Sequence, residues 1–212
     1  MGLPASSPSS RRVTLRLLRD SAHYGEVIER GLAKARVSVW IATANLKDVH
    51  VEAPIGSRAR ARGRAVSIVE VLRGLVQRGV EVRVLHGCLP SGPFRASLAR
   101  LGGARELGVS LRRCPRVHMK MIAVDGAMLY LGSANFTGAG LGMRSPGRRN
   151  FEAGVVTDDE LMLDEMQAAF QAIWSGSECA ACKLRRECPA PLDQVRRPRV
   201  LPPRTARTKT PA

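Results

Sequence analysis

Apolar residues recur along the chain in two alternating patterns, one typical of helices and the other typical of buried strands. Helical spacing covers residues 24–36, 66–78, 93–101 and 158–174. Short apolar and β-branched runs, typical of strands buried on both faces, cover residues 37–44, 80–85, 119–124, 128–131 and 154–157. Helices that alternate with buried strands predict an α/β fold, a layered mixed sheet flanked by helices.

The same pattern predicts one domain with shorter segments at its ends. We expect a flexible leader at 1–12, the α/β domain at 13–175, a Cys-rich segment at 176–190 and a disordered basic tail at 191–212. Proline and arginine dominate the tail, and this composition works against regular structure. Residues 56–65 are rich in glycine and arginine, which predicts an exposed, mobile, cationic loop.

The charge balance adds information about the partner. The 212 residues include 34 Lys and Arg against 18 Asp and Glu, a formal net charge of +16. Such a surplus indicates a polyanionic partner, either nucleic acid or an anionic membrane surface. Aromatic residues are only 4% of the chain, which argues against extensive base-stacking platforms. No apolar run is long enough for a membrane span, and residues 1–10 lack a secretory signal, so we expect a cytoplasmic protein.

One stretch concentrates side chains suited to phosphate chemistry. His118 and Lys120 are two residues apart in a predicted strand, so their side chains project from the same face. Ser133 and Asn135 follow the next strand and offer hydroxyl and amide donors for phosphate oxygens. Histidine can also attack phosphorus as a nucleophile. These four residues therefore predict a phosphoryl-binding site with a nucleophile.

The spacing of these residues resembles a known signature. The pattern H-x-K-x4-D, followed by six residues and G-S-x-N, resembles the signature of the phospholipase D superfamily, with Asp125 and Gly132 at the supporting positions. We expect Asp125 to hold the turn between the two strands through backbone hydrogen bonds. Asn150-Phe151-Glu152 resembles the family's downstream element, whose carboxylate bonds the catalytic histidine. The resemblance covers roughly residues 15–174 and implies a phospholipase D-like fold and catalytic domain.

The chain carries one copy of the signature, whereas larger members of the family carry two. The resemblance therefore implies a homodimer with one composite site. It implies that His118 of one protomer attacks the phosphodiester to form a phosphohistidine, and that His118 of the other protonates the leaving oxygen and then activates water. Lys120 and Asn135 of both chains would hold the phosphoryl oxygens with help from Ser133, and Glu152 would fix the histidine tautomer. No cofactor is implied for catalysis, since the paired lysines and asparagines stabilise the charge.

The family includes enzymes that act on nucleic acids and enzymes that act on lipids. A nuclease acting on DNA or RNA fits the net charge and the arginines that we expect to contact the substrate, which are Arg58, Arg60, Arg62, Arg64, Arg148 and Arg149. The alternative is a phospholipid phosphodiesterase or phosphatidyltransferase, similar to cardiolipin synthase, with anionic lipid as substrate. A lipid enzyme favours apolar membrane-binding loops, and residues 138–146 offer only Leu141 and Met143. A second alternative is a non-catalytic nucleic-acid-binding module, against which the intact signature argues.

Three of the five cysteines form a C-x2-C-x5-C run at Cys179, Cys182 and Cys188, a spacing that suits thiolate ligands of a metal. The run resembles the C-terminal cysteine triplet of iron–sulfur nucleases of the RecB-like class, which implies a structural [4Fe–4S] cluster. The fourth ligand is Cys114 or Cys88, and we expect Cys114, which precedes His118 in a loop. Zinc is the alternative metal, and free or redox-active thiols without a metal are the third possibility.

Overall fold

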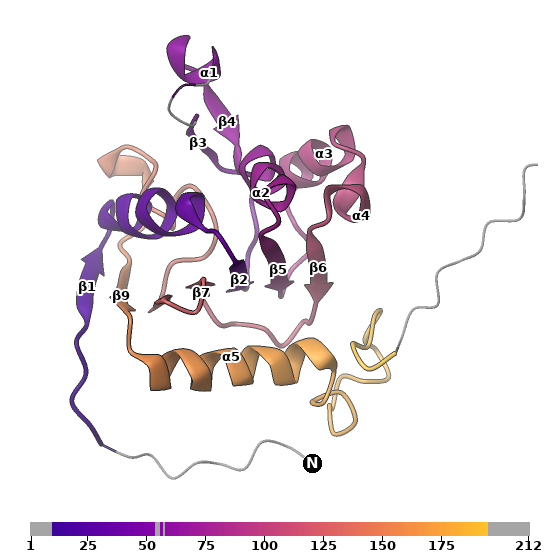
Figure 1. Ribbon diagram of the computed structural model, residues 1–212. Helices are drawn as coiled ribbons and strands as arrows, with labels where there is room; N and C mark the ends of the chain where they lie inside the picture. Colours follow the sequence, from indigo (N-terminus) through magenta and orange to yellow (C-terminus); the bar gives the residue numbers. More distant parts are fainter. Residues whose placement is uncertain (1–9, 54–55, 57, 195–212) are drawn as a thin grey trace, which may run out of the picture.

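A seven-stranded mixed sheet forms the centre of the protein (Figure 1). The computed structural model describes residues 10–53, 56 and 58–194. The strand order is β1-β9-β8-β7-β2-β5-β6. The strands are β1 (Arg16–Arg19), β2 (Ser38–Thr43), β5 (Glu81–His86), β6 (Ser110–Arg113), β7 (Met121–Val124), β8 (Met128–Gly132) and β9 (Ala153–Thr157). The predicted α/β fold with a mixed sheet is confirmed.

The sheet has a parallel half and an antiparallel half that meet at β2. Strands β2, β5 and β6 run parallel, whereas β7 pairs antiparallel with both β2 and β8. Strand β9 continues the antiparallel half between β8 and β1. All four residues of β7 are buried, because helices cover both faces of the sheet.

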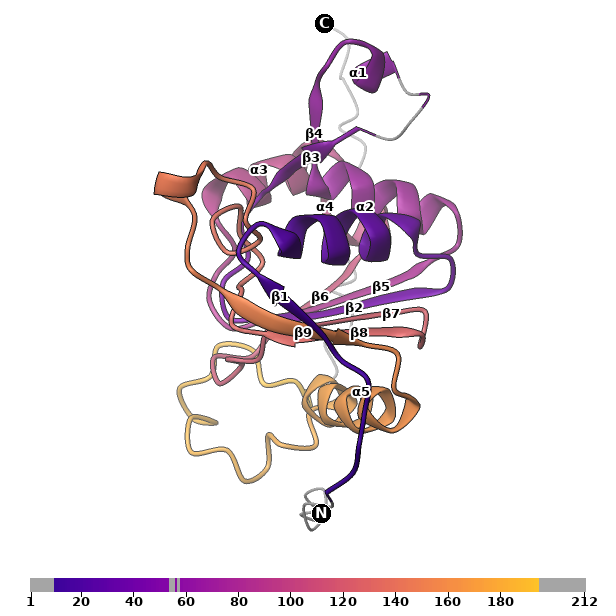
Figure 2. The same ribbon diagram turned by 90° about the vertical axis from the view of Figure 1, so that its left-hand side faces the viewer.

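Helices lie on both sides of this sheet, as Figure 2 shows edge-on. One face is covered by the π-type helix η1 (Tyr24–Gly31), the 3-10 turn η2 (Leu32–Lys34), α2 (Ile68–Gln77), α3 (Gly92–Arg100) and α4 (Gly103–Leu107). The opposite face is covered by α5 (Glu160–Ser175). Each layer has its own apolar core. Val27, Ile28 and Leu72 belong to the first core, and Leu129 and Phe170 to the second.

A hairpin of β3 (His50–Glu52) and β4 (Ala65–Ser67) rises from the helical layer and carries the short helix α1 (Arg58–Ala61) near its tip (Figures 1 and 2). We call residues 50–67 the arm. The prediction of a loop at 56–65 is therefore wrong in part, because pairing with β3 draws Ala65 into a strand and Arg58–Ala61 forms a turn of helix. The following helix begins at Ile68, two residues later than predicted, because the Ser67 hydroxyl accepts the Val69 N–H at 3.1 Å and caps it.

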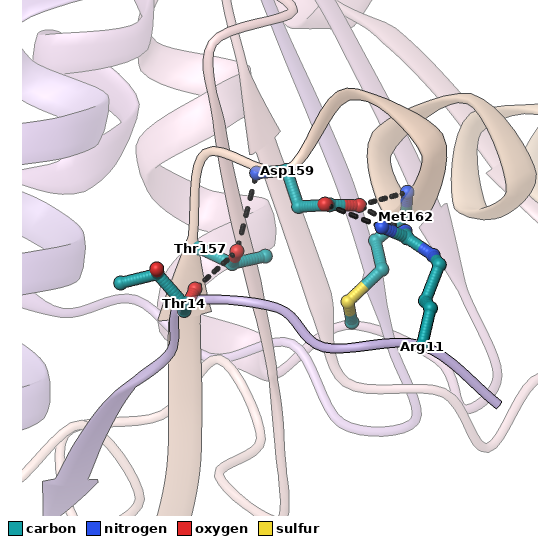
Figure 3. Close-up of polar contacts among 5 residues, drawn as sticks. All are labelled: Arg11, Thr14, Thr157, Asp159 and Met162. Carbon is teal, nitrogen blue, oxygen red and sulfur yellow. Dashed lines mark hydrogen bonds and ion pairs between the residues drawn. The ribbon is translucent and has the colours of Figure 1, made fainter.

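The chain before β1 is bound to the junction of β9 and α5 (Figure 3). The Arg11 guanidinium pairs with the Asp159 carboxylate, and the Thr157 hydroxyl donates to the Thr14 carbonyl at 2.8 Å. Asp159 also caps α5 by accepting the Met162 N–H at 2.8 Å. The hydrogen bond from Arg11, followed by the one from Met162, lowers the pKa of Asp159 to about 2. Residues 10–12 of the predicted leader thus lie in a bound segment, whereas residues 1–9 lie outside the described part of the chain.

After α5 the chain makes successive turns with no helix or strand at 176–194. Leu192 in this segment packs against the second core, and its carbonyl lies 3.4 Å from the Arg112 guanidinium. Most of the tail predicted at 191–212 lies outside the described residues, which end at 194. Among the described helices, none combines the length and apolar character that crossing a bilayer requires.

Candidate active site

The signature residues lie at the ends of central strands, where β8 ends and β7 and β9 begin. We call this side of the sheet the reacting edge. His118 and Lys120 lie in the extended segment directly before β7, and Ser133 and Asn135 follow β8. Antiparallel pairing of β7 with β8 sets the beginning of one strand against the end of the other, and the Gly132 N–H donates to the Lys120 carbonyl at 3.2 Å. The two halves of the signature therefore meet at this edge.

His118 and Lys120 project together, as their spacing predicts, although the strand itself begins only at Met121. The Lys120 Nζ lies 2.9 Å from Nδ1 and 3.2 Å from Nε2 of the exposed His118 ring. An ammonium donor at this distance needs a ring nitrogen with a lone pair. A nucleophilic histidine uses a lone pair of the same kind. Burial lowers the pKa of Lys120, and the nearby Glu152 charge opposes this shift.

Glu152 reaches the same edge from the residue before β9. Its carboxylate accepts hydrogen bonds from the Ser133 hydroxyl and from the Asn150 amide, the latter at 2.9 Å. Its backbone N–H donates to the Asp20 carboxylate at 3.0 Å, which fixes the start of β9. Glu152 and Ser133 are therefore coupled within one protomer, and the bond from Glu152 to His118 stays a prediction.

Asn135 is oriented by the end of β2. Its side-chain oxygen accepts the Asn45 N–H at 3.1 Å and lies 3.4 Å from the Thr43 hydroxyl. With the oxygen engaged in this way, the amide Nδ2 is the part of the side chain that can donate to an anion. Sequence reasoning missed Thr43 and Asn45, although their position at the carboxyl end of a predicted strand was a usable signal.

Gly132 is required by close packing between β8 and β9. A Cβ at this position would lie 2.8 Å from the Ala153 carbonyl and would meet the Tyr130 hydroxyl. Tyr130 is buried beneath the site, where burial raises its pKa to about 12, and its hydroxyl accepts the Ala134 N–H at 3.4 Å. Tyr130 is a supporting residue that the sequence analysis did not identify, because its role depends on contacts between strands.

Asp125 accepts backbone hydrogen bonds, as predicted, but its partners lie at the start of β2 and not in its own turn. Its carboxylate accepts the backbone N–H groups of Arg36, Val37 and Ser38 at 2.8 to 3.1 Å. Burial raises the pKa of Asp125, and the N–H donors of Ser38, Val37 and Arg36 together bring it below its ordinary value. Asp125 thus joins the turn after β7 to the start of β2, away from the reacting edge.

The six predicted substrate-binding arginines fall into two groups. Arg148 and Arg149 lie at the 3-10 turn η3 (Pro146–Arg148), close in sequence to Asn150 and Glu152. The other four are exposed on the arm, where Arg60 pairs with Glu52: they are Arg58, Arg60, Arg62 and Arg64. The structure therefore separates the predicted basic residues into a pair at η3 and a group on the arm.

Four of the five cysteines line one small cavity beyond the end of α5: Cys114, Cys179, Cys182 and Cys188. Cys88 is exposed and is not among the residues around it. Burial raises the pKa of the Cys114 thiol, whereas hydrogen bonds from the Leu184 backbone and the Arg116 side chain lower that of Cys182. Among the described residues, no group of three or more His, Cys, Asp or Glu side chains is already arranged to hold a metal ion.

Comparison with known families identifies the superfamily of the chain. A family model described as "Cardiolipin synthase, PLD-like domain" matches residues 28–174, which include every signature position and Glu152. The chain belongs to the phospholipase D superfamily. It is therefore a phosphodiesterase of that superfamily, whose members hydrolyse or transfer phosphodiesters. Both nucleic acids and phospholipids contain the bond on which this chemistry acts.

Several solved structures of low sequence identity share the fold. NucT from Helicobacter pylori has 16% identity and a TM-score of 0.53, with 76% of this chain and 94% of that chain covered. Nuc from Salmonella typhimurium, a phospholipase D family member, has 21% identity and a TM-score of 0.51, and the match covers 77% of this chain and 95% of that chain. Polyphosphate kinase from Porphyromonas gingivalis has 15% identity and a TM-score of 0.50, and the match covers 77% of this chain and 26% of that one. No curated protein matches the sequence.

Proposed function

We propose that this phospholipase D-like protein is a nuclease that cleaves DNA or RNA without a catalytic metal, at a site shared by two protomers. The observation that carries the proposal is the arginine-rich arm, which begins a few residues beyond the signature site. Asn45 bonds Asn135 within the site, and the arm starts at His50. A polyanion held along the arm would therefore extend from the reacting edge, and phosphate contacts of this kind bind any sequence.

The reaction is a double displacement at phosphorus. A ring nitrogen of His118 forms a bond to phosphorus, and the bond to the leaving oxygen breaks as His118 of the partner subunit donates a proton to that oxygen. The same partner histidine then takes a proton from water, which attacks phosphorus and releases His118. Lys120 Nζ and Asn135 Nδ2 hold the non-bridging oxygens, where negative charge develops.

A second copy of the chain supplies what one copy lacks. One signature provides one histidine, and the two-step reaction needs both a nucleophile and an acid. His118 is exposed in the single chain, and Phe151, adjacent to Glu152, has a relative exposure of 93%. An aromatic side chain this exposed beside the site is what a partner surface would cover.

The description of the matching family model favours a second candidate, a phosphodiesterase or phosphatidyltransferase that acts on anionic phospholipid. The apolar residues of 138–146, which a membrane-binding loop would present, weigh against it. Leu141 is fully buried, and Met143 packs against the first core. The loop therefore offers little apolar surface to a bilayer.

A substrate panel separates these functions. Purified protein is given plasmid DNA, single-stranded DNA, RNA and vesicles of phosphatidylglycerol and cardiolipin, each in the presence of a chelator. We expect cleavage of nucleic acid, a loss of about 1000-fold or more in His118→Ala, and little change in the control Glu70→Gln, on the exposed face of α2 outside both the site and the arm. Turnover of lipid alone would support the second candidate. Binding of nucleic acid without cleavage would indicate a non-catalytic module, and dependence on added metal would contradict the proposed chemistry.

A further inference from the structure

The segment after α5 folds back against the connection between β6 and β7, and cysteines lie on both sides of the contact. Cys179, Cys182 and Cys188 come from the segment, and Cys114 comes from the connection. Together they line a cavity of about 30 Å³. Four cysteines from two distant parts of the chain therefore line one cavity, and the exposed Cys88 is not among its lining residues.

The backbone of the segment turns between the two cysteines of the C-x2-C pair. The Cys182 N–H donates to the Cys179 carbonyl at 3.2 Å, which closes a tight turn across the C-x2-C pair. The Arg185 N–H then donates to the Cys182 carbonyl at 3.0 Å and continues the chain toward Cys188. A turn of this kind lets two thiolates reach one metal from neighbouring positions.

The segment lacks the usual sources of stability. It has no helix or strand at 176–194, and of its two leucines Leu184 is 41% exposed while Leu192 packs against the second core. One contact within the segment involves a thiol, because Cys179 Sγ accepts the Leu192 N–H at 3.3 Å. Short segments with so little apolar burial are commonly held by a metal or by disulfides, and all five cysteines are free.

We propose that Cys114, Cys179, Cys182 and Cys188 bind a metal centre through four thiolates, as a zinc ion or a [4Fe–4S] cluster. Both centres take four cysteine ligands, and each thiol loses its proton to solvent when it binds. Because no three such groups in the described residues are already at ligand geometry, the turns must close around the metal as it binds.

Such a centre would be a structural clamp next to the reacting edge. The Cys114 N–H donates to the His86 carbonyl at 3.0 Å at the end of β5, and its carbonyl accepts the Val117 N–H at 2.9 Å. Val117 is buried and directly precedes His118. The clamp would therefore fix the connection that carries the nucleophile, although the metal site itself does not depend on the proposed nuclease activity.

Metal analysis of the full chain tests this proposal. Protein purified without oxygen is assayed for zinc, iron and acid-labile sulfide per protomer, together with its visible absorbance. We expect one zinc, or four irons with sulfide and a brown colour, and either result supports the site. Cys182→Ser and Cys188→Ser should lose the metal, whereas the matched control Cys88→Ser should retain it. Wild-type protein with none of these metals, or equal metal loss in Cys88→Ser, would overturn the proposal.

A titration of the wild type guards against variants that fail to fold. The chain is stripped of metal under reducing conditions and titrated with cadmium, whose bonds to thiolate give an ultraviolet charge-transfer band. We expect saturation at one equivalent, with a higher melting temperature for the loaded protein because the metal binds only the folded state. No band or no rise in melting temperature would contradict the site, whatever the activity of the protein on nucleic acid.

Discussion

Lys120 is the residue whose charge depends most directly on its neighbours in the site. Burial lowers its pKa below the ordinary value of 10.5, and the Glu152 carboxylate acts in the opposite direction. The ammonium must keep its proton to hold a phosphoryl oxygen. Activity that depends on Lys120 is therefore present below its pKa and lost as the pH rises through it.

The pH dependence of turnover tests this coupling. We expect the alkaline limb of kcat/KM to fall at a pH below 10.5, and Glu152→Gln to move that limb to still lower pH, because it removes the charge that raises the pKa of Lys120. The control Glu70→Gln, on the exposed face of α2, should leave the limb in place. A limb that stays fixed or moves to higher pH in Glu152→Gln would contradict the assignment.

The edge where β8 meets β9 depends on glycines that face each other. Gly132 is paired with Gly154, and the Tyr130 ring occupies the space that their side chains would need. A Cβ on Gly154 would lie 2.9 Å from the Tyr130 hydroxyl, and one on Gly132 would lie 2.8 Å from the Ala153 carbonyl. The position of Ser133 thus depends on the absence of a side chain at the residue before it.

Substitution of this glycine should affect both stability and activity. We expect Gly132→Ala to lower the free energy of unfolding by about 1–3 kcal/mol, because the strands must separate to admit the methyl group. Activity should fall with it, since Ser133 and its bond to Glu152 move. Gly92→Ala, where nothing lies within 4 Å of the added Cβ, should change stability by less than about 1 kcal/mol. Denaturant unfolding measures both, and a Gly132→Ala protein as stable as the wild type would contradict the packing argument.

The elements that the sequence predicted well are those with long apolar patterns. The runs at 37–44 and 128–131 and the helix at 158–174 all appear, with shifts of one or two residues at their ends. Strands β1 and β6 were missed because each is a four-residue strand at an edge of the sheet and contains two arginines, so it forms no apolar run. The arm was missed because its strands have three residues each and depend on each other for pairing.

The site was predictable to the extent that its chemistry is local in sequence. His118 and Lys120 project together because of their spacing. Backbone bonding by Asp125 was predicted, but its partners at the start of β2 are distant in sequence and were not. The role of Tyr130 was not predictable, because it arises from strands brought together by the sheet. The sequence also could not predict that η1 is a π-helix, because the spacing of its apolar residues is close to that of an ordinary α-helix.

In the whole molecule, the positive net charge and the twofold symmetry of the proposed dimer both favour contact with a polyanion. The net charge of +16 is spread over the chain, and the arm concentrates part of it on a projecting hairpin (Figure 1). A twofold dimer would present two arms around one composite site, so a polyanion could contact both protomers. Each phosphate contact adds affinity that salt weakens.

Removal of the arm arginines should weaken nucleic-acid binding and its salt dependence together. We expect Arg58→Ala, Arg62→Ala and Arg64→Ala combined to make the slope of log K against log salt shallower by up to about 2.7 for duplex DNA, about 0.9 for each phosphate that the protein no longer neutralises. The control removes the same charge from exposed arginines of α2, its C-terminal cap and α4, which are Arg73, Arg78 and Arg105. Equal effects of the two triple variants on the slope would show that net charge, and not the arm, determines binding.

The covalent intermediate gives the most direct test of the shared site. Protein mixed with a labelled phosphodiester substrate is quenched rapidly at alkaline pH, where phosphohistidine survives, and the labelled peptide is identified by mass spectrometry. We expect a phosphorus adduct on His118 in no more than one of the two protomers of a dimer, and none in His118→Ala. Turnover without an adduct, an adduct on another residue, or labelling of both protomers at once would contradict the shared site.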